Sequence, residues 1–268
     1  MVLTDKPSAF LSPYVKSYWM IENILSQGRE HIQRIVPTGL LDLSFHLGDK
    51  PKSSGTSKTI AEHSVITGHI NQCFDIIITG RLSLFSIYFY PHGLALFLDV
   101  PVKELNNQTI PLKYLVRKDV NELEEQLAST LSFHGRIKRV ERFLHRRLMQ
   151  NTKKSPDSRI NSSIQRINHM KGMVDIHDLA SEACLTRRQF ERIFREDVGT
   201  YPKQFLKIVR FQHALQIHAA NKKKSLTELA FDCGYYDQSH MIGDFVQMSG
   251  KSPKEYFGEG AVYSDYFQ

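Results

Sequence analysis

The spacing of apolar residues divides the chain into two halves with different secondary structure. Up to about residue 110, apolar positions alternate with polar ones or form short runs between turn residues, which is typical of β-strands. Strands are predicted over 16–24, 31–36, 40–47, 64–70, 74–79 and 82–90, and a surface loop over 48–58. Many short strands at close intervals predict a small barrel or a double-sheet sandwich.

Beyond residue 90 the apolar spacing changes to that of helices. A short helix is predicted over 93–99, a connecting segment over 101–113, and helices over 120–131 and 135–149. On the last of these, one apolar stripe lies among lysines and arginines and consists of Ile137, Val140, Leu144 and Leu148. The stripe is suited to packing on the strands of the same chain, and its basic surroundings to DNA that flanks a binding site. The polar, proline-containing segment 151–158 predicts a domain boundary.

The last third of the chain contains one helical unit twice, over 178–205 and 228–256. The matching positions are Leu179 and Leu229, Ala180 and Ala230, Ala183 and Cys233, Phe190 and Met241, Phe194 and Phe245, Gly199 and Gly250, Pro202 and Pro253, and Phe205 and Tyr256. The second copy has one extra residue in its turn. Two copies are too few for a solenoid, so the repeat predicts two small helical modules that face one common target.

Each copy has the sequence signals of a helix-turn-helix. In the first, Asp175 is placed to cap a short helix, and a capping box of Thr186 and Gln189 starts a second helix after a turn at 184–185. The 3.6-residue period gives this second helix an apolar face of Phe190, Ile193 and Phe194. The outward face carries Arg187, Arg188, Glu191, Arg192 and Arg195.

The second copy repeats these signals. Ser225 and Glu228 form a capping box, Gly234 suits a turn with positive φ, and Asp237 caps the second helix. Its outward face carries Gln238, Ser239, His240 and Ile242. Between the copies, a helix over about 202–219 starts at a proline and spans about 27 Å at 1.5 Å per residue. That length sets the two outward helices close to one turn of B-DNA apart, roughly 34 Å, so that both enter successive major grooves.

Residues 160–257 resemble the DNA-binding domain of the AraC/XylS family of bacterial transcription regulators. The resemblance rests on both turns, on GTYPKQF and GKSPKEY after the two outward helices, and on GYYDQSHMIGDF. It implies base contacts by Arg187, Arg188, Gln189 and Arg192 in the first module and by Gln238, Ser239, His240 and Ile242 in the second. Phosphate contacts are expected at the starts of the following helices, from Thr200, Lys203, Ser252 and Lys254. One departure is Gly243, which stands where family members usually have a basic residue, as Arg192 is in the first module. We therefore expect the second module to bind its half-site more weakly.

The N-terminal half is similar to that of one branch of the same family, in SPYVKSYWMIE, IVPTGLLDLSFHLGD and YPHGLALFLDVPVKEL. The resemblance implies a cupin-like barrel and, for helices such as 135–149, a dimer contact. The expected fold is α+β, with a cupin-like sensor domain over 1–115 and a helical linker or dimerisation region over 116–154. A double helix-turn-helix domain over 155–258 and a tail over 259–268 follow. Trp19, Phe45 and Tyr88 are candidates for an apolar effector pocket, and the same aromatic residues suit an ordinary core equally well.

Charge changes this picture less than its total suggests. The 268 residues are enough for two domains, and their net charge of +7 favours a polyanionic partner. Residues 155–268, however, hold 15 Lys and Arg against 14 Asp and Glu, so the DNA-binding region is not basic as a whole. What counts is the placement of arginines on one helix face, where phosphate and guanine contacts need them. The alternative is a solvated face on which these arginines pair with Glu191 and Glu196.

Other classes of function are less favoured. The N-terminal histidines are scattered singly, and Cys73, Cys184 and Cys233 have no CxxC spacing, so we expect no metal, no cofactor and buried, reduced thiols. Cys73 also lacks the neighbours of the reactive cysteine in DNA-repair proteins of the alkyl-transfer type. Without a signal peptide or an apolar run that spans a membrane, a cytoplasmic, nucleoid-associated protein is expected.

The sequence therefore favours a transcription regulator, an activator by family habit, whose partners are double-stranded promoter DNA, a small-molecule effector and RNA polymerase. A monomer and a homodimer both remain open. The alternatives are a ligand-independent or architectural DNA-binding protein and, more remotely, a cupin-type enzyme fused to a DNA-binding domain.

Overall fold

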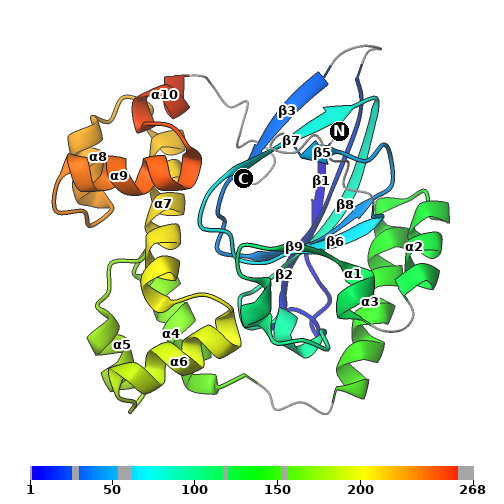
Figure 1. The fold of residues 1–268 in the computed structure, drawn as a ribbon, viewed down its shortest axis with the longest axis horizontal. Coiled ribbons are helices and arrows are strands. Elements are labelled where there is room, and N and C mark those ends of the chain that lie inside the picture. The colour runs from blue at the N-terminus through cyan, green and yellow to red at the C-terminus, as the bar shows by residue number, and fades with distance from the viewer. Residues whose placement is uncertain (1, 26–29, 54–61, 117–119, 152–155, 259–268) are drawn as a thin grey trace. The chain divides into compact units, whose positions relative to one another are not determined.

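The structure is a computed structural model that describes residues 2–25, 30–53, 62–116, 120–151 and 156–258. It divides into two compact units (Figure 1). Unit 1 comprises Met1–Arg34, Leu40–Gly68 and Phe74–Ser155, and unit 2 comprises Ile35–Gly39, His69–Cys73 and Pro156–Gln268. The predicted tail 259–268, most of the predicted loop 48–58 and residues 152–155 of the predicted boundary lie outside the described residues. In the described part of the chain, no helix has the length and apolar content needed to cross a bilayer.

The strands of unit 1 form two sheets. The larger has the order β1-β2-β8-β4-β6-β9 and consists of β1 (Val2–Asp5), β2 (Val15–Ile24), β8 (Arg81–Phe89), β4 (Leu41–His46), β6 (Ser64–Thr67) and β9 (Thr109–Pro111). The smaller has the order β3-β7-β5 and consists of β3 (Glu30–Ile35), β7 (Phe74–Thr79) and β5 (Lys52–Ser53). All six predicted strands are confirmed, whereas β1, β5 and β9 were not predicted. The architecture is therefore the β-rich, α+β one expected from the sequence.

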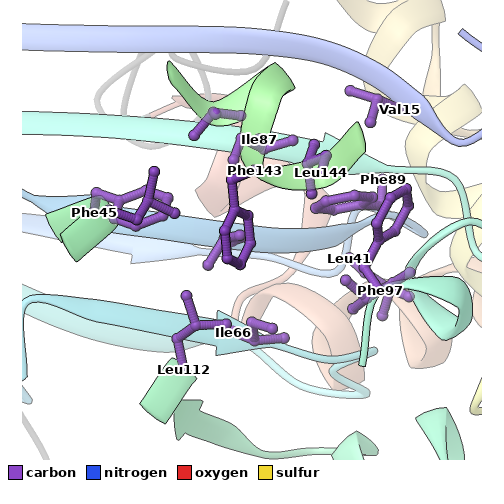
Figure 2. Packing of buried hydrophobic residues seen from close by; sticks show 14 of the residues in the cluster. Val15, Leu41, Phe45, Ile66, Ile87, Phe89, Phe97, Leu112, Phe143 and Leu144 are labelled. Atoms are coloured by element: carbon purple, nitrogen blue, oxygen red, sulfur yellow. The ribbon is translucent and has the colours of Figure 1, made fainter. Parts of the chain in front are cut away.

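Two faces of the larger sheet have different chemistry because side chains alternate along each strand. Trp19 on β2 is opposite Ser86 on β8, and Ser86 is opposite Ser44 on β4, so these three share one face. Phe45 lies on the other face with Phe85 and Ile87, in the buried core of unit 1 (Figure 2).

The helices of unit 1 pack on that core. They are the short turns η1 (Leu94–Leu96) and η2 (Val102–Leu105), then α1 (Leu112–Leu115), α2 (Val120–Ser129) and α3 (Phe133–Gln150). Val140 and Leu144 of the predicted stripe are at most 1% exposed and share one cluster with Phe45 and Leu41. The apolar stripe of α3 is therefore buried against the apolar face of the larger sheet, in the core of unit 1. The described part of the predicted helical linker or dimerisation region, 116–154, belongs to unit 1.

Unit 2 is helical and is organised around one long helix. Its helices are α4 (Ser158–His169), α5 (Ile176–Glu182), α6 (Arg187–Val198), α7 (Pro202–Ala220), α8 (Leu226–Asp232), α9 (Gln238–Ser249) and α10 (Pro253–Gly258). Figure 1 shows α4, α5 and α6 around one end of α7 and α8, α9 and α10 around the other. Helix α7 begins at Pro202, as predicted, with Tyr201 as its N-cap. Two short segments from earlier in the chain also belong to this unit, and Val36 of the first is buried against Ile208 and Phe211 of α7.

Candidate nucleic-acid interface

The two predicted helix-turn-helix modules have the same turn geometry. In the first, Cys184 has φ 53° and Leu185 N–H donates to the Ala180 carbonyl at 3.0 Å. In the second, Gly234 has φ 69° and Tyr235 N–H donates to the Ala230 carbonyl at 3.0 Å. The left-handed residue reverses the chain after the first helix of each module, and the second helix starts three residues later in the first module and four residues later in the second. The sequence repeat is therefore a repeat of backbone structure.

Local caps fix where the outward helices start. Thr186 Oγ1 accepts from Gln189 N–H at 3.3 Å while Gln189 Oε1 accepts from Thr186 N–H at 3.0 Å, which is the predicted capping box of α6. In the second module Asp237 Oδ1 accepts from His240 N–H at 2.7 Å. Gly199 and Gly250 end the two helices with φ 92° and φ 73°. The repeat thus extends to the C-terminal ends of both helices.

Both helices are anchored by buried residues at matching positions. Phe190 and Phe194 on α6 match Met241 and Phe245 on α9, and all four are buried. Because the two residues on each helix are four positions apart, they lie on one face, and the opposite face points away from the core. The next matching pair, Phe205 on α7 and Tyr256 on α10, is also buried.

The outward face of α6 is basic and exposed. Arg187 Nε pairs with Glu191 at 2.9 Å, and Arg192 Nη1 pairs with Glu196 at 3.3 Å. Without DNA, two of these arginines thus pair with glutamates on the solvent-exposed face of α6. All four side chains are more than a third exposed, and such pairs contribute little to stability, about 0.3–0.5 kcal/mol. An anion can therefore displace the glutamates at small cost. Arg188 is exposed and, among the described residues, has no ion-pair partner.

The outward face of α9 is polar but carries no basic side chain at the matching position. Ser239 and His240 are exposed, whereas Gln238 and Ile242 are half-buried. Gln238 Oε1 also accepts from Thr227 Oγ1 at 3.0 Å, which ties it to α8. A Cβ atom added to Gly243 would meet no atom of the described chain within 4 Å, so the position has room for a side chain.

Comparisons with known proteins agree with this geometry. Residues 179–259 match the family described as a helix-turn-helix domain, and residues 4–111 match a domain of unknown function, DUF6597. The probable transcriptional regulator LumQ of Photobacterium leiognathi is 31% identical over 88 residues, which make up 33% of this chain and 35% of LumQ. The transcriptional activator RhaS of Escherichia fergusonii is 28% identical over 103 residues, 37% of this chain and 36% of RhaS. The C-terminal domain of this chain is of the AraC/XylS type.

The matches to these relatives span about a third of their length. A solved structure of ToxT from Vibrio cholerae aligns over 90% of this chain and 97% of ToxT, with a TM-score of 0.48 and 11% identity. The two helix-turn-helix modules are the part of the chain that matches named transcription regulators.

The predicted phosphate contacts need two corrections. Thr200 is 1% exposed, so neither its side chain nor its N–H is accessible to DNA. The N–H of Ser252 donates to Glu255 Oε2 at 2.8 Å in a capping box of its own, so it is already used. Lys203 and Lys254 are exposed next to these helix starts, and they remain the expected phosphate ligands.

A buried ion pair that was not predicted holds α9 against α7. Asp244 is 4% exposed, and its Oδ1 accepts from Lys207 Nζ at 2.6 Å. Arg210 lies 3.9 Å from the other carboxylate oxygen and stacks over the Tyr235 ring at 5.0 Å. A signal was present in the sequence, since Asp244 falls on the apolar stripe between Met241 and Phe245. The partner, 37 residues away, could not be identified from spacing.

The predicted effector residues separate between the two faces of the sheet in unit 1. Trp19 and Tyr88 stack with ring centroids 5.9 Å apart, whereas Phe45 lies in the core on the opposite face and cannot line the same site. Asp42, opposite Tyr88 in the sheet, shares the face of the stacked pair. Burial raises the pKa of Asp42 to about 7, and burial together with this carboxylate raises the pKa of Tyr88.

The three cysteines are free thiols in different surroundings. Cys233 is buried, which raises its pKa to about 12, whereas Cys184 is exposed and Cys73 is half-buried. The expectation of buried thiols is therefore correct only for Cys233. Among the described residues, no group of three or more His, Cys, Asp or Glu side chains is placed to hold a metal ion.

Proposed function

We propose that this protein is a sequence-specific DNA-binding transcription regulator in which α6 and α9 read neighbouring major-groove segments of one duplex. The observation that carries the proposal is the repeated turn, in which a left-handed residue and a matching backbone hydrogen bond recur in both modules. The two modules are joined by α7, whose 19 residues span about 28 Å. Successive major-groove segments on one side of B-DNA are roughly 34 Å apart, which one chain of this design can match.

The side chains of α6 supply the main base contacts in this proposal. Arg188 and Arg192 are suited to bidentate contacts with guanine O6 and N7. The Oε1 atom of Gln189 is used by the capping box, so its amide group is available as a donor. On α9, Ser239 and His240 are the exposed polar groups, with Gln238 and Ile242 at the edge of the contact.

Selection of bound sequences from a random DNA pool, with the purified chain at stated salt, tests this proposal. We expect two short conserved blocks about one helical turn apart. Enrichment of one block would show that a single module reads DNA. Binding without any enriched sequence would contradict the proposal and favour an architectural role.

An alanine substitution identifies the reading helix. Arg188→Ala should cost about 1–3 kcal/mol of binding free energy and relax the base preference in one block only. Lys222→Ala is the matched control, because this exposed lysine follows α7 and its loss changes the net charge equally. If both variants lose the same small amount of affinity without a change in preference, α6 is not the reading helix.

We further propose that unit 1 binds a small effector on the sheet face that holds Trp19, Tyr88 and Asp42. We also propose that the DNA-bound protein recruits RNA polymerase in the cytoplasm and so activates transcription, which is supported by the similarity to RhaS, a named transcriptional activator. A thermal-shift screen with small molecules tests the first part, because a ligand that binds the folded unit must raise its stability. A promoter fused to a reporter gene, with and without the protein, tests the second.

A further inference from the structure

The exposed side chain of His240 on α9 rests against a buried aromatic ring. The imidazole of His240 meets the ring of Tyr235 edge to face, with the ring centroids 5.3 Å apart and the planes at 86°. Tyr235 is 4% exposed, so this ring belongs to the packed interior of the second module. One of the polar groups that α9 presents to solvent is therefore in contact with a rigid part of unit 2.

The backbone of His240 is fixed by the cap of α9. Its N–H donates to Asp237 Oδ1 at 2.7 Å, and His240 is the third residue of the helix. Long side chains of a helix point back towards its N-terminus. Tyr235 lies in the turn that precedes this N-terminus, so its ring limits the orientations that are open to the imidazole.

Tyr235 is itself held by two other helices. Its N–H donates to the carbonyl of Ala230 on α8 at 3.0 Å. The guanidinium of Arg210 on α7 lies over its ring, 5.0 Å from the centroid. Arg210 and Lys207 lie 3.9 Å and 2.6 Å from the two carboxylate oxygens of Asp244 on α9. The ring under His240 is thus fixed to α7 and α8, and the ion pairs of Asp244 fix α9 to α7.

The first module holds the residue at the same helix position by a different contact. Gln189 is the third residue of α6, and its Oε1 accepts from the N–H and the hydroxyl of Thr186 at 3.0 Å and 2.9 Å. The counterpart of Tyr235 is Leu185, whose N–H donates to the Ala180 carbonyl at 3.0 Å. Since a leucine serves in the first turn, the backbone of such a turn does not require an aromatic ring.

We propose that Tyr235 is a positioning residue that holds the His240 ring in one orientation for base reading, with Arg210 fixing Tyr235 from the side of α7. This inference rests on the proposed function, in which α9 reads one block of the DNA site. A side chain that is already ordered in the free protein loses less conformational entropy when it binds. A ring with fixed donor and acceptor directions also discriminates better among base edges, whose hydrogen-bonding patterns differ in the major groove.

The proposal is tested by selecting bound DNA sequences with the full-length protein and with its variants, followed by competition binding. The position read by His240 is the one whose base preference His240→Ala removes. We expect Tyr235→Leu, which installs the residue of the first module, to lower the affinity ratio between the preferred and the next base at that position. The decrease should be roughly two- to tenfold, the cost of ordering one free side chain, and the block read by α6 should be unchanged.

Two further variants separate the ring from other effects. Tyr235→Phe keeps the ring and should keep the preference. Tyr236→Leu, the same substitution at the adjacent residue, which is 88% exposed, is the matched control and should also keep it. The double variant Tyr235→Leu/His240→Ala should discriminate no worse than His240→Ala alone, because the tyrosine acts through the imidazole.

A spectroscopic readout distinguishes positioning from loss of the fold. In NMR spectra the ring signals of His240 should move towards those of an unstructured histidine in Tyr235→Leu and should stay in place in Tyr235→Phe, because the ring current of residue 235 is lost only in the first. Thermal unfolding shows whether Tyr235→Leu is folded. If it is not, Arg210→Gln leaves the ring but removes the cation above it, and should lower the same base preference.

The outcomes separate this inference from the proposed function. If the parent protein enriches no sequence, DNA reading by α9 and the role of Tyr235 both fail. Two enriched blocks with no position that responds to His240→Ala overturn the positioning role alone. The same holds if folded Tyr235→Leu, or folded Arg210→Gln in its place, keeps the full preference at the His240 position.

Discussion

Replacing the carboxyl group of Asp42 should stabilise unit 1 at neutral pH. Asp42 Oδ1 is buried and accepts no hydrogen bond from the residues that the structure describes, whereas Oδ2 accepts from Ser44 Oγ at 2.7 Å. Burial raises the pKa from its ordinary 3.8 to about 7. Between these values the folded chain holds a proton that the unfolded chain releases, so the free energy of unfolding falls as pH rises from about 4 to 7.

The size of the effect follows from this shift. Three pKa units at about 1.4 kcal/mol each give a penalty of up to ~4 kcal/mol above pH 7. Asp42→Asn removes this penalty but weakens the hydrogen bond from Ser44, which costs about 1 kcal/mol. We therefore expect the variant to be more stable by about 2–3 kcal/mol at pH 8 and nearly equal to the parent protein at pH 4.

Trp19 makes this prediction measurable in the full-length protein. It is the single tryptophan of the sequence and lies on the same sheet face as Asp42, so its fluorescence reports the unfolding of unit 1. Urea titrations at pH 4, 5, 6, 7 and 8 give the difference in unfolding free energy at each pH. Glu104→Gln, at an exposed position of η2, is the control and should show no such trend. A gain for Asp42→Asn that is the same at pH 5 and pH 8 would refute the reasoning.

Further substitutions test the HTH modules. Cys184→Gly should stabilise unit 2 by up to ~1 kcal/mol, whereas Gly234→Ala should destabilise it by at least ~1 kcal/mol, because both positions have left-handed backbone; thermal unfolding of both variants checks the opposite signs. Asp244→Asn should cost about 1–3 kcal/mol by leaving Lys207 without its buried partner, and hydrogen exchange should show the loss first in α9. Gly243→Arg should tighten DNA binding and steepen its salt dependence by about one unit, while Gly243→Ala should add only helix stability. Equal DNA affinity of the two Gly243 variants would contradict a phosphate or base contact at this position.

Much of the fold was predictable because its signals are local. The strand predicted over 74–79 is β7, and the capping boxes at Thr186 and Ser225 form as expected, since a cap depends on residues three apart. Strands of two to four residues, such as β5 and β1, show no measurable period and were missed. Which strands pair, and in which register, cannot be predicted from spacing along the sequence. This pairing places Phe45 on the sheet face opposite Trp19.

Long-range partners explain the remaining errors. The apolar stripe of α3 was equally suited to a second copy or to its own sheet, and only the fold shows that the sheet of unit 1 covers it. Whether a helix start is accessible to DNA also depends on tertiary packing. Thr200 was predicted to contact phosphate but is buried, and Ser252 was predicted to do so but donates its N–H to Glu255.

The outward faces of the two modules differ in charge, and this difference predicts different contributions to DNA binding. The first presents Arg187, Arg188 and Arg192 from α6, whereas the corresponding face of α9 presents no arginine or lysine at the matching positions. Contacts by cations supply most of the salt-dependent affinity for DNA, and polar groups such as His240 add preference with less affinity. We therefore infer that α6 anchors the chain and that α9 selects among sites already held by α6. In that case, mutating the DNA block read by α6 abolishes binding at physiological salt, while mutating the block read by α9 leaves a weaker complex with an almost unchanged salt slope.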